Sequence, residues 1–246
     1  MLGRVFGVFC AVCFWSIVIS VLWVLVLRVV PPPITWAMAQ QHNEEGQVRR
    51  EWCPLERMTH DMPLAVIASE DQVFFDHFGF DWKAMREAMK YNDRKKGRRV
   101  KGASTISQQT AKNVFCWPGR TFVRKGFEAW FTLLIECFWS KDRIVEVYLN
   151  VAETGKGRFG VEATAHQCFQ RSTHALSASQ CALIAAVLPL PRKFNACAPS
   201  GYVQRRQHWI LGQMGNLGDL FDPSVRQRIR EERERNEARS TKRRKR

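Results

Sequence analysis

The sequence predicts a mainly α-helical protein with a single membrane-spanning helix at its N-terminus. Residues 5–27 contain no charged side chain, and an uncharged apolar run of this length can cross the hydrocarbon core of a bilayer as a helix. Apolar side chains recur at helical spacing over residues 127–138, and residues 177–188 begin with a serine of capping type and end before Pro189. Alternating patterns typical of strands are scarce.

The chain divides by composition into four segments. We expect residues 1–30 to form a cytoplasmic stub and membrane anchor, and residues 31–60 to form a linker and the first helix of the domain. Residues 61–220 are the expected main domain, and residues 221–246 form a basic C-terminal tail. The stretch of about 215 residues after the anchor suits one domain by size.

An uncleaved anchor competes with a cleaved signal peptide for the N-terminal run. Residues 37–39 (Ala-Met-Ala) resemble a cleavage site. The run is long for a signal peptide, however, and the three prolines at 31–33 separate it from that site, so we favour an anchor. Arg4 and Arg28 flank the run with similar charge, so charge alone does not set its orientation.

The chain is strongly basic, with a formal net charge of +15. Basic residues concentrate in residues 86–101 and 226–246. Nucleic-acid binding and adhesion to anionic lipid headgroups both account for such charge. The membrane helix favours lipid, and we expect no nucleic-acid partner. The mixed Arg and Glu of the tail also fits a solvated segment.

The eight cysteines and six histidines show no metal-site spacing. Cys10 and Cys13 lie inside the predicted span, and the other cysteines are scattered singly. Burial as small apolar side chains is the default for those. An oxidising compartment would allow disulfides, although their pairing cannot be deduced from sequence. Metal ligation therefore stays undecided.

An acidic pair, Glu70 and Asp71, follows an apolar run and precedes two phenylalanines, Phe74 and Phe75. A carboxylate beside apolar side chains loses hydration and holds a proton more readily. This is the property of a general base that works near neutral pH. A surface acidic pair at a helix end is the alternative, and a second polar segment further along the chain weighs against it.

That second segment lies about thirty residues later and reads Gly-Ala-Ser-Thr-Ile-Ser-Gln-Gln-Thr-Ala-Lys-Asn. Ser104 or Thr105 can cap the N-terminus of a helix. Gln108, Gln109 and Lys112 then lie on the following turns. Amides, hydroxyls and an ammonium on one helix suit a sugar or polyanionic ligand. A plain polar face of a helix explains the polarity but not the density of amides.

Two further patterns follow. Arg120, Arg124 and Lys125 precede Glu128. On a helix Arg124 and Glu128 are four residues apart, so an ion pair is a fair alternative to a functional role. The glycines of residues 155–160 have dinucleotide-binding spacing, but no strand precedes them and no acidic residue follows about twenty positions later. We interpret them as a turn with close helix packing.

Together these segments resemble the glycosyltransferase domain shared by class A penicillin-binding proteins and monofunctional peptidoglycan transglycosylases. The ordered set spans residues 64 to about 195 and is very specific as a set. The chain departs from the family pattern at Cys168, where an aromatic is common, and at Phe127, where a polar residue is common. In chain order, the matching positions are Glu70, Asp71, Phe74, His77 and Gly79; Gly102 to Asn113; Arg124, Lys125 and Glu128; Lys141, Ile144, Glu146, Tyr148, Leu149 and Asn150; and Gly155, Gly157, Gly160, Glu162 and Ala163.

The resemblance implies a lysozyme-like, two-lobed helical domain and a peptidoglycan glycosyltransferase. Such an enzyme polymerises lipid II, a disaccharide-peptide on undecaprenyl pyrophosphate, into β-1,4-linked glycan with inversion. Glu70 would deprotonate the 4-hydroxyl of the acceptor. Glu128 would assist the leaving group directly, through water, or through a divalent Mg or Mn cation. By analogy with inverting glycosidases, the two carboxylates would stand roughly 6.5–9.5 Å apart.

The same resemblance implies two sets of substrate-binding residues. Lys112, Arg120 and Arg124 would neutralise the leaving pyrophosphate, because an anion of that charge needs fixed cations in the transition state. Three more polar side chains would orient the donor: Ser104, Gln108 and Gln109.

Lipid II and the growing glycan strand are the expected partners, with anionic membrane lipid and other cell-wall synthesis or division proteins as further candidates.

The resemblance also implies a single-pass protein of the bacterial inner membrane, with its catalytic domain on the periplasmic side. No Ser-x-x-Lys or Lys-Thr-Gly occurs in the chain, so it lacks the residues of a transpeptidase. A lytic transglycosylase or lysozyme is an alternative, but a hydrolase of neutral glycan needs no cradle for pyrophosphate. A membrane-anchored scaffold is another, and the presence of both glutamates argues against it.

Overall fold

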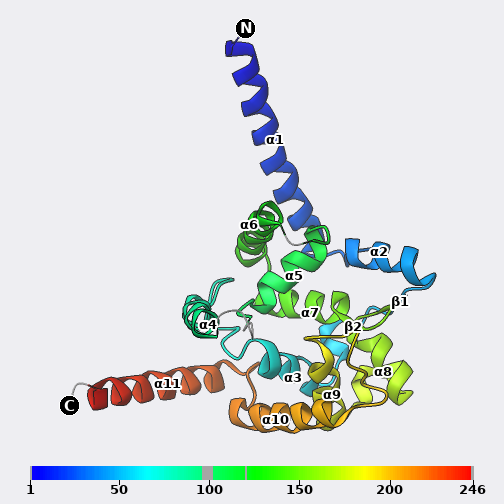
Figure 1. Cartoon of the computed structure of the whole chain (residues 1–246), viewed down its shortest axis with the longest axis vertical. Helices are drawn as coiled ribbons and strands as arrows, with labels where there is room; N and C mark the ends of the chain where they lie inside the picture. Colours follow the sequence, from blue (N-terminus) through cyan, green and yellow to red (C-terminus); the bar gives the residue numbers. More distant parts are fainter. Residues whose placement is uncertain (1, 96–101, 120, 245–246) are drawn as a thin grey trace.

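The computed structural model describes residues 2–95, 102–119 and 121–244, and it confirms the mainly helical fold class. Figure 1 shows a helical body from which the long helix α1 (Leu2–Leu27) projects at the N-terminal end. A second long helix, α11 (Pro223–Arg244), leaves the body at the end remote from α1. Within α1, Arg4–Leu27 is long and apolar enough to cross a membrane, which is compatible with the predicted single-pass anchor.

The other elements of the described chain form the body. Its α-helices are α2 (Trp36–Glu45), α3 (Asp61–Glu70), α4 (Trp82–Arg94), α5 (Ile106–Phe115), α6 (Phe122–Phe138), α7 (Lys141–Val151), α8 (Val161–Phe169), α9 (Ala178–Val187) and α10 (Gly201–Leu217). Two 3₁₀ turns and three short strands complete it: η1 (Leu55–Arg57), η2 (Thr173–Ala175), β1 (Arg49–Arg50), β2 (Glu153–Gly155) and β3 (Arg158–Phe159).

The last turns of α1 are part of the body. Val24 and Leu27 are buried in the core. The indole N–H of Trp130 on α6 donates to Ser20 Oγ at 3.1 Å, and that of Trp139 donates to the carbonyl of Val24 at 2.8 Å. Because backbone and side-chain groups of α1 are both engaged, the helix leaves the body at a fixed position.

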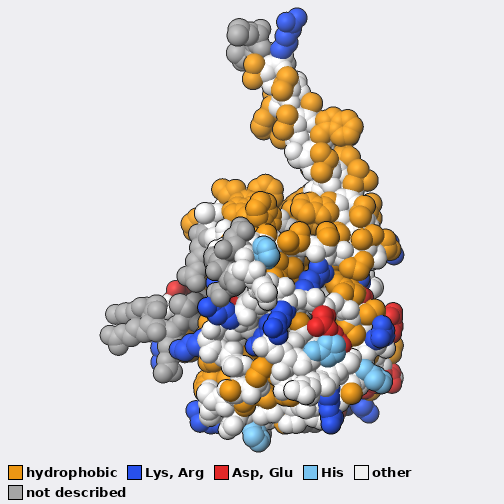
Figure 2. All heavy atoms as spheres, turned by 90° about the vertical axis from the view of Figure 1, so that its right-hand side faces the viewer, with side chains coloured by type: hydrophobic (Ala, Val, Ile, Leu, Met, Phe, Trp, Pro, Cys, Tyr) orange, Lys and Arg blue, Asp and Glu red, His pale blue; other side chains and the backbone are white. Residues whose placement is uncertain are grey.

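Apolar side chains continue from α1 onto the neighbouring surface. Figure 2 shows hydrophobic side chains along the projecting helix and on the part of the body nearest to it. Contiguous exposed apolar surface of this kind marks an interaction with a membrane or a partner. The exposed residues that α6 contributes are Phe122, Val123, Phe127, Trp130 and Leu133.

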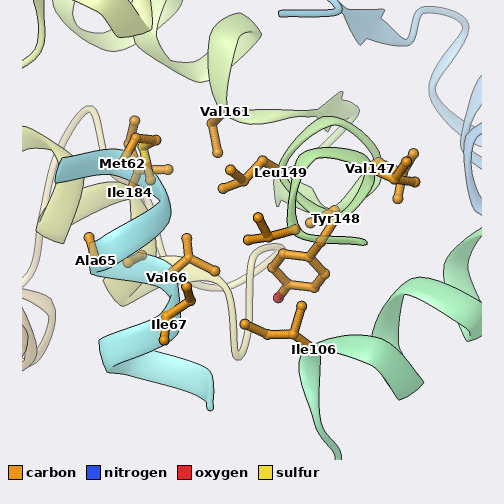
Figure 3. Close-up of a cluster of buried hydrophobic side chains, with 14 of the residues drawn as sticks. Met62, Ala65, Val66, Ile67, Ile106, Val147, Tyr148, Leu149, Val161 and Ile184 are labelled. Carbon is orange, nitrogen blue, oxygen red and sulfur yellow. The ribbon is translucent and has the colours of Figure 1, made fainter. Parts of the chain in front are cut away.

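The helices of the body fall into two groups (Figure 1). Helices α5, α6 and α7 pack together toward the α1 end of the body, and α3, α9 and α10 pack together further from α1, with α8 beside them. Between the groups, side chains of α3, α5 and α7 share one apolar core, which includes Ile67, Ile106, Tyr148 and Leu149 (Figure 3). This core fixes the two groups of helices relative to each other.

A three-stranded sheet of order β1-β3-β2 closes the side of the body near α8. β1 lies in the segment predicted as linker and first domain helix, and it pairs in parallel with β3. Between β2 and β3, Gly157 has a φ of +68°, which favours glycine. A Cβ at Gly160 would lie 3.0 Å from the carbonyl oxygen of Asn150. The glycines therefore serve a turn and close packing, as interpreted from the sequence.

Two features of the C-terminal half could not be derived from the sequence. Cys168 at the end of α8 and Cys197 after α9 form a disulfide. The basic tail is helical over Pro223–Arg244. The first turns of this helix dock onto the segment after α3 through Arg230 and Arg233, each 2.9 Å from a carboxylate oxygen of Asp76.

Candidate active site

A cleft with a volume of about 1090 Å³ is lined by residues from both groups of helices. It collects every predicted site residue that the structure describes. Arg120 alone among the predicted site residues lies outside the described residues. The predicted residues on the cleft wall are Glu70, Ser104, Gln108, Gln109, Lys112, Arg124 and Glu128.

Glu70 is the last residue of α3, and both of its carboxylate oxygens have neighbours. Ser69 Oγ lies 3.2 Å from Oε1, and a guanidinium nitrogen of Arg206 lies 3.6 Å from the same oxygen. Gln109 Nε2 donates to Oε2 at 3.2 Å. The side chain retains 13% of its exposure, so a substrate hydroxyl can still reach a carboxylate that is held by its neighbours.

The N-terminus of α5 is built by a capping box. Thr105, not Ser104, is the capping residue, and its hydroxyl accepts from the backbone N–H of Gln108. The side-chain carbonyl of Gln108 accepts in return from the backbone N–H of Thr105 at 3.1 Å. Gln108 is therefore engaged in holding the start of the helix. The N-cap residue, Thr105, contributes about 1 kcal/mol to helix stability.

Glu128 on α6 is buried and lies inside a cluster of cations. Arg124 donates to one of its oxygens at 2.8 Å, and Lys125 contacts the other. The side chain of Glu128 is only 3% exposed. The ion pair that the spacing predicted is thus present, and it is part of the wall of the cleft. A buried carboxylate costs free energy unless it is paired, and the two cations provide that pairing and hold the side chain in place.

Lys112 on α5 projects toward the same cluster. Its side chain stays open to the space of the cleft, but the surrounding protein lowers its pKa by desolvation, while Glu128 acts in the opposite sense. Burial, and after it the charge of Glu128, raises the pKa of the nearby Cys116 thiol to about 11. This thiol stays protonated near neutral pH and is therefore a poor nucleophile.

The donor set of the cleft does not build a resident metal site. Among the described residues, no group of three or more His, Cys, Asp or Glu side chains lies close enough to hold an ion. Both oxygens of Glu128 are engaged with Arg124 and Lys125. The one side chain that the sequence offered for a divalent cation is therefore committed to other partners, and we assign no step to a protein-bound ion.

Other residues of the motifs hold the scaffold. Lys141 donates to the carbonyl of His77 at 2.7 Å and pairs with Glu136 at 2.8 Å. The side-chain oxygen of Asn150 accepts from the backbone N–H of Cys53 at 2.8 Å. These contacts keep the segment after Glu70 and the start of the domain against α7.

Two residues of the site were missed by sequence reasoning. Arg206 lies on α10, beyond the matched motifs, in a run of polar residues without a distinguishing pattern. Tyr148 belongs to a matched motif, but its spacing indicates only a helical position. Its hydroxyl donates to Gln109 Oε1 at 3.3 Å, a contact between α7 and α5 that no local pattern could reveal.

Comparison with known proteins agrees with this geometry. The family model described as Transglycosylase matches residues 37–215. A biosynthetic peptidoglycan transglycosylase of Pseudomonas syringae pv. syringae (strain B728a) is 50% identical over 210 residues, which cover 83% of this chain and 88% of the relative. The relative of the same name from Xanthomonas axonopodis pv. citri (strain 306) is 50% identical over 206 residues, covering 81% and 83%.

The helical fold and these matches define the protein as a glycosyltransferase. The matched region contains the whole cleft wall described above, from Ala37 to Arg206. The chain belongs to the transglycosylase family.

Proposed function

We propose that the protein is a peptidoglycan glycosyltransferase that polymerises lipid II into β-1,4-linked glycan strands. The observation that carries this proposal is the arrangement of charge in the cleft. Glu70 is held by an amide, a hydroxyl and one guanidinium, whereas Glu128 is surrounded by cations. A proton acceptor and a site for an anionic leaving group are thus both present on the wall of one cleft. The names of the relatives support the same substrate class.

In the proposed reaction, the 4-hydroxyl oxygen of the acceptor attacks the anomeric carbon of the donor. A carbon–oxygen bond forms as the bond between that carbon and the pyrophosphate oxygen breaks, and the bonding pair leaves with the pyrophosphate. Glu70 takes the hydroxyl proton. Attack opposite the leaving group inverts the anomeric configuration.

The cations of α5 and α6 would stabilise the leaving group. Negative charge on the pyrophosphate grows as its bond breaks, and fixed cations in a partly desolvated site stabilise such charge. We assign this role to Lys112 and Arg124, together with Arg120. Glu128 would act through Arg124 and Lys125 by keeping their charges in position. For donor orientation we propose Ser104 and Gln109, with Gln108 fixing the start of α5.

The membrane helix supports a lipid-linked substrate. The last turns of α1 are seated in the body, and exposed apolar side chains of α6 lie on the adjoining surface. A polyprenyl tail could then stay in the bilayer while its pyrophosphate enters the cleft. We propose that α1 anchors the protein in the inner membrane, with the catalytic domain on the periplasmic side and no transpeptidase activity.

Turnover of labelled lipid II by the full-length protein in liposomes tests the proposal. The parent should release undecaprenyl pyrophosphate and form glycan, and Glu70→Gln should abolish both without loss of fold, because the change keeps size and removes the proton acceptor. Glu87→Gln on the exposed face of α4 is the matched control and should behave like the parent. Near-parental turnover by folded Glu70→Gln protein would overturn the assignment of Glu70. Cleavage of finished glycan without pyrophosphate release would instead indicate a hydrolase.

A further inference from the structure

Three polar side chains from three different helices form a continuous chain in the wall of the cleft. The Tyr148 hydroxyl on α7 donates to Gln109 Oε1 at 3.3 Å. The amide nitrogen of Gln109 on α5 then donates to Glu70 Oε2 at 3.2 Å. The hydrogen bonds run in one direction, from the buried phenol to the carboxylate proposed as the base.

Tyr148 is a fixed and permanent donor at the start of this chain. The residue is 2% exposed, and its ring projects from α7 between α3 and α5, with Ile67 and Ile106 nearby (Figure 3). Burial raises its pKa well above the ordinary value, and the charges of Glu70 and Asp71 raise it further. The hydroxyl therefore keeps its proton across the working pH range, while the packed ring limits its movement.

The position of this hydroxyl decides which end of the Gln109 carboxamide faces Glu70. A glutamine side chain has an accepting oxygen at one end and a donating nitrogen at the other. Because the phenol donates, it pairs with the oxygen and leaves the nitrogen for the carboxylate. A rotated amide would place its oxygen against a carboxylate oxygen and leave the phenol without its acceptor, and both changes are unfavourable.

Glu70 depends on such donors because of its place in the fold. It is the last residue of α3. The C-terminal end of a helix carries a partial negative charge, which makes this an unfavourable place for a carboxylate without hydrogen-bond donors. Asp71 follows directly and is paired with His77 at 3.0 Å. Ser69 and Arg206 contact Oε1 of Glu70. Gln109 is the residue that donates a hydrogen bond to the other oxygen, Oε2.

We infer that Tyr148 is a positioning residue for the transfer reaction, acting through Gln109 to orient the carboxylate of Glu70 and to favour its ionised form. The inference rests on the proposed function, because it assigns Glu70 the role of base. It adds to the donor orientation proposed above for Gln109, since the carboxamide here also serves the base itself.

Tyr148→Phe removes the hydroxyl and keeps the packed ring. We expect turnover of labelled lipid II by the full-length protein to fall about threefold to tenfold, the effect of one hydrogen bond, with KM nearly unchanged. A freed amide donates less effectively to the carboxylate, so Glu70 is protonated more readily. The acidic limb of the pH–turnover profile should therefore move to higher pH by about half to one unit. Tyr91→Phe on α4 is the matched control and should leave both the turnover and the acidic limb of the profile unchanged.

Gln109→Met tests the middle of this chain of hydrogen bonds, and the double variant tests whether Tyr148 and Gln109 are coupled. Gln109→Met removes the donor, so it should shift the acidic limb in the same direction as Tyr148→Phe. Adding Tyr148→Phe to Gln109→Met should then lower turnover little further, because the phenol acts only through the amide. Independent roles would instead give effects that multiply.

The outcomes separate the inference from the proposed function. If the parent does not turn over lipid II, the proposed function fails whatever Tyr148 does. If Glu70→Gln stays active, the assignment of Glu70 as the base fails, and this inference fails with it. If Glu70→Gln is inactive but Tyr148→Phe keeps the parental acidic limb, this inference is overturned, and a lower melting temperature alone would then mark Tyr148 as a packing residue. Fully multiplicative effects of the two substitutions also overturn it.

Discussion

The side chain of Asp71 accepts a hydrogen bond at 3.0 Å from the backbone N–H of Ile106, the first residue of α5. The same carboxylate oxygen is 3.0 Å from His77 Nε2. A carboxylate at a helix N-terminus is favoured by the unpaired N–H groups and by the helix dipole. Glu70 directly precedes Asp71, and Lys112 lies on α5. This contact therefore fixes the position of the proposed base relative to a cation of the cleft.

Asp71→Asn should therefore loosen the cleft. An asparagine has only one accepting oxygen, and its NH2 group, itself a donor, would lie against another hydrogen-bond donor. We therefore expect the free energy of unfolding to fall by about 1–3 kcal/mol. Turnover should fall as well, because α5 is no longer held against the end of α3. Urea unfolding and lipid II turnover measure the two effects. Asp93→Asn, on the exposed face of α4, is the control, and an unfolding midpoint of Asp71→Asn equal to that of the parent would contradict the expectation.

The disulfide between Cys168 and Cys197 should contribute to stability. It closes a loop with a sequence separation of 29, for which loss of chain entropy in the unfolded state gives about 3–4 kcal/mol. Cys168→Ser should lower the urea midpoint by a corresponding amount, and a reductant should lower that of the parent but not that of the variant. Cys137→Ser, at an exposed free cysteine, is the control. Equal midpoints with and without reductant would show that the bond is not formed in solution.

Local patterns predicted helices such as α6 and α9, because apolar spacing and capping residues depend on short segments of sequence. The start of α9 shows this well: Ser177 and Gln180 form a capping box, and serine followed three residues later by glutamine is visible in the sequence. Glu70 and Glu128 are also marked by the residues around them. Their assignment to one site came from the ordered set of motifs that resembles a known family, because the spacing around Glu128 by itself also allowed a simple ion pair.

Contacts between distant segments were not predictable. Arg206 approaches Glu70 across 136 positions, and nothing near either residue indicates the other. The partner of Cys168 could not be chosen among scattered cysteines. Gln108 lines the cleft with the other predicted residues, but the engagement of its carbonyl in the cap of α5 was not predicted. Spacing places a side chain on a helix face, whereas its partners depend on the packing of other helices.

The surface beside α1 should bind membranes without the anchor. Phe122 is 98% exposed and Phe127 is 47% exposed, and the chain carries a large positive charge. A protein lacking residues 1–30 should still sediment with anionic vesicles, more weakly than the parent and less at high salt. A truncated, folded domain that stays soluble beside such vesicles at low salt would contradict this.

The apolar part of that surface can be tested separately. Phe122→Ser with Phe127→Ser should reduce sedimentation of the truncated domain, whereas Met89→Ser, at an exposed position of α4, should not. Thermal melts must accompany the assay, because the truncation also removes the buried side chains of Val24 and Leu27, each worth roughly 1.5–3 kcal/mol when fully buried.

The alkaline side of the pH profile should report on Lys112. Burial lowers its pKa from the usual 10.5, so its charge is lost as pH rises through the lowered value, and turnover should decline there. Stability should change in the opposite sense, because over this range the unfolded chain binds more protons than the folded one and rising pH favours folding. Lys112→Arg keeps the charge and should move the decline of turnover to higher pH. Lys90→Arg on α4 should leave the profile as it is.

Replacing Lys112 with Met tests the proposed pyrophosphate site most directly. If the ammonium stabilises charge that grows as the bond breaks, its interaction is stronger in the transition state than with the bound donor. Turnover should therefore fall on the order of a hundredfold, while the affinity for a non-reacting pyrophosphate donor analogue falls much less. Steady-state kinetics and binding of that analogue, with thermal melts as the folding check and Lys90→Met as the matched control, separate these effects. Turnover within a few-fold of the parent would mean that other cations hold the leaving group, and Arg124 and Lys125, which contact Glu128, would be the next to replace.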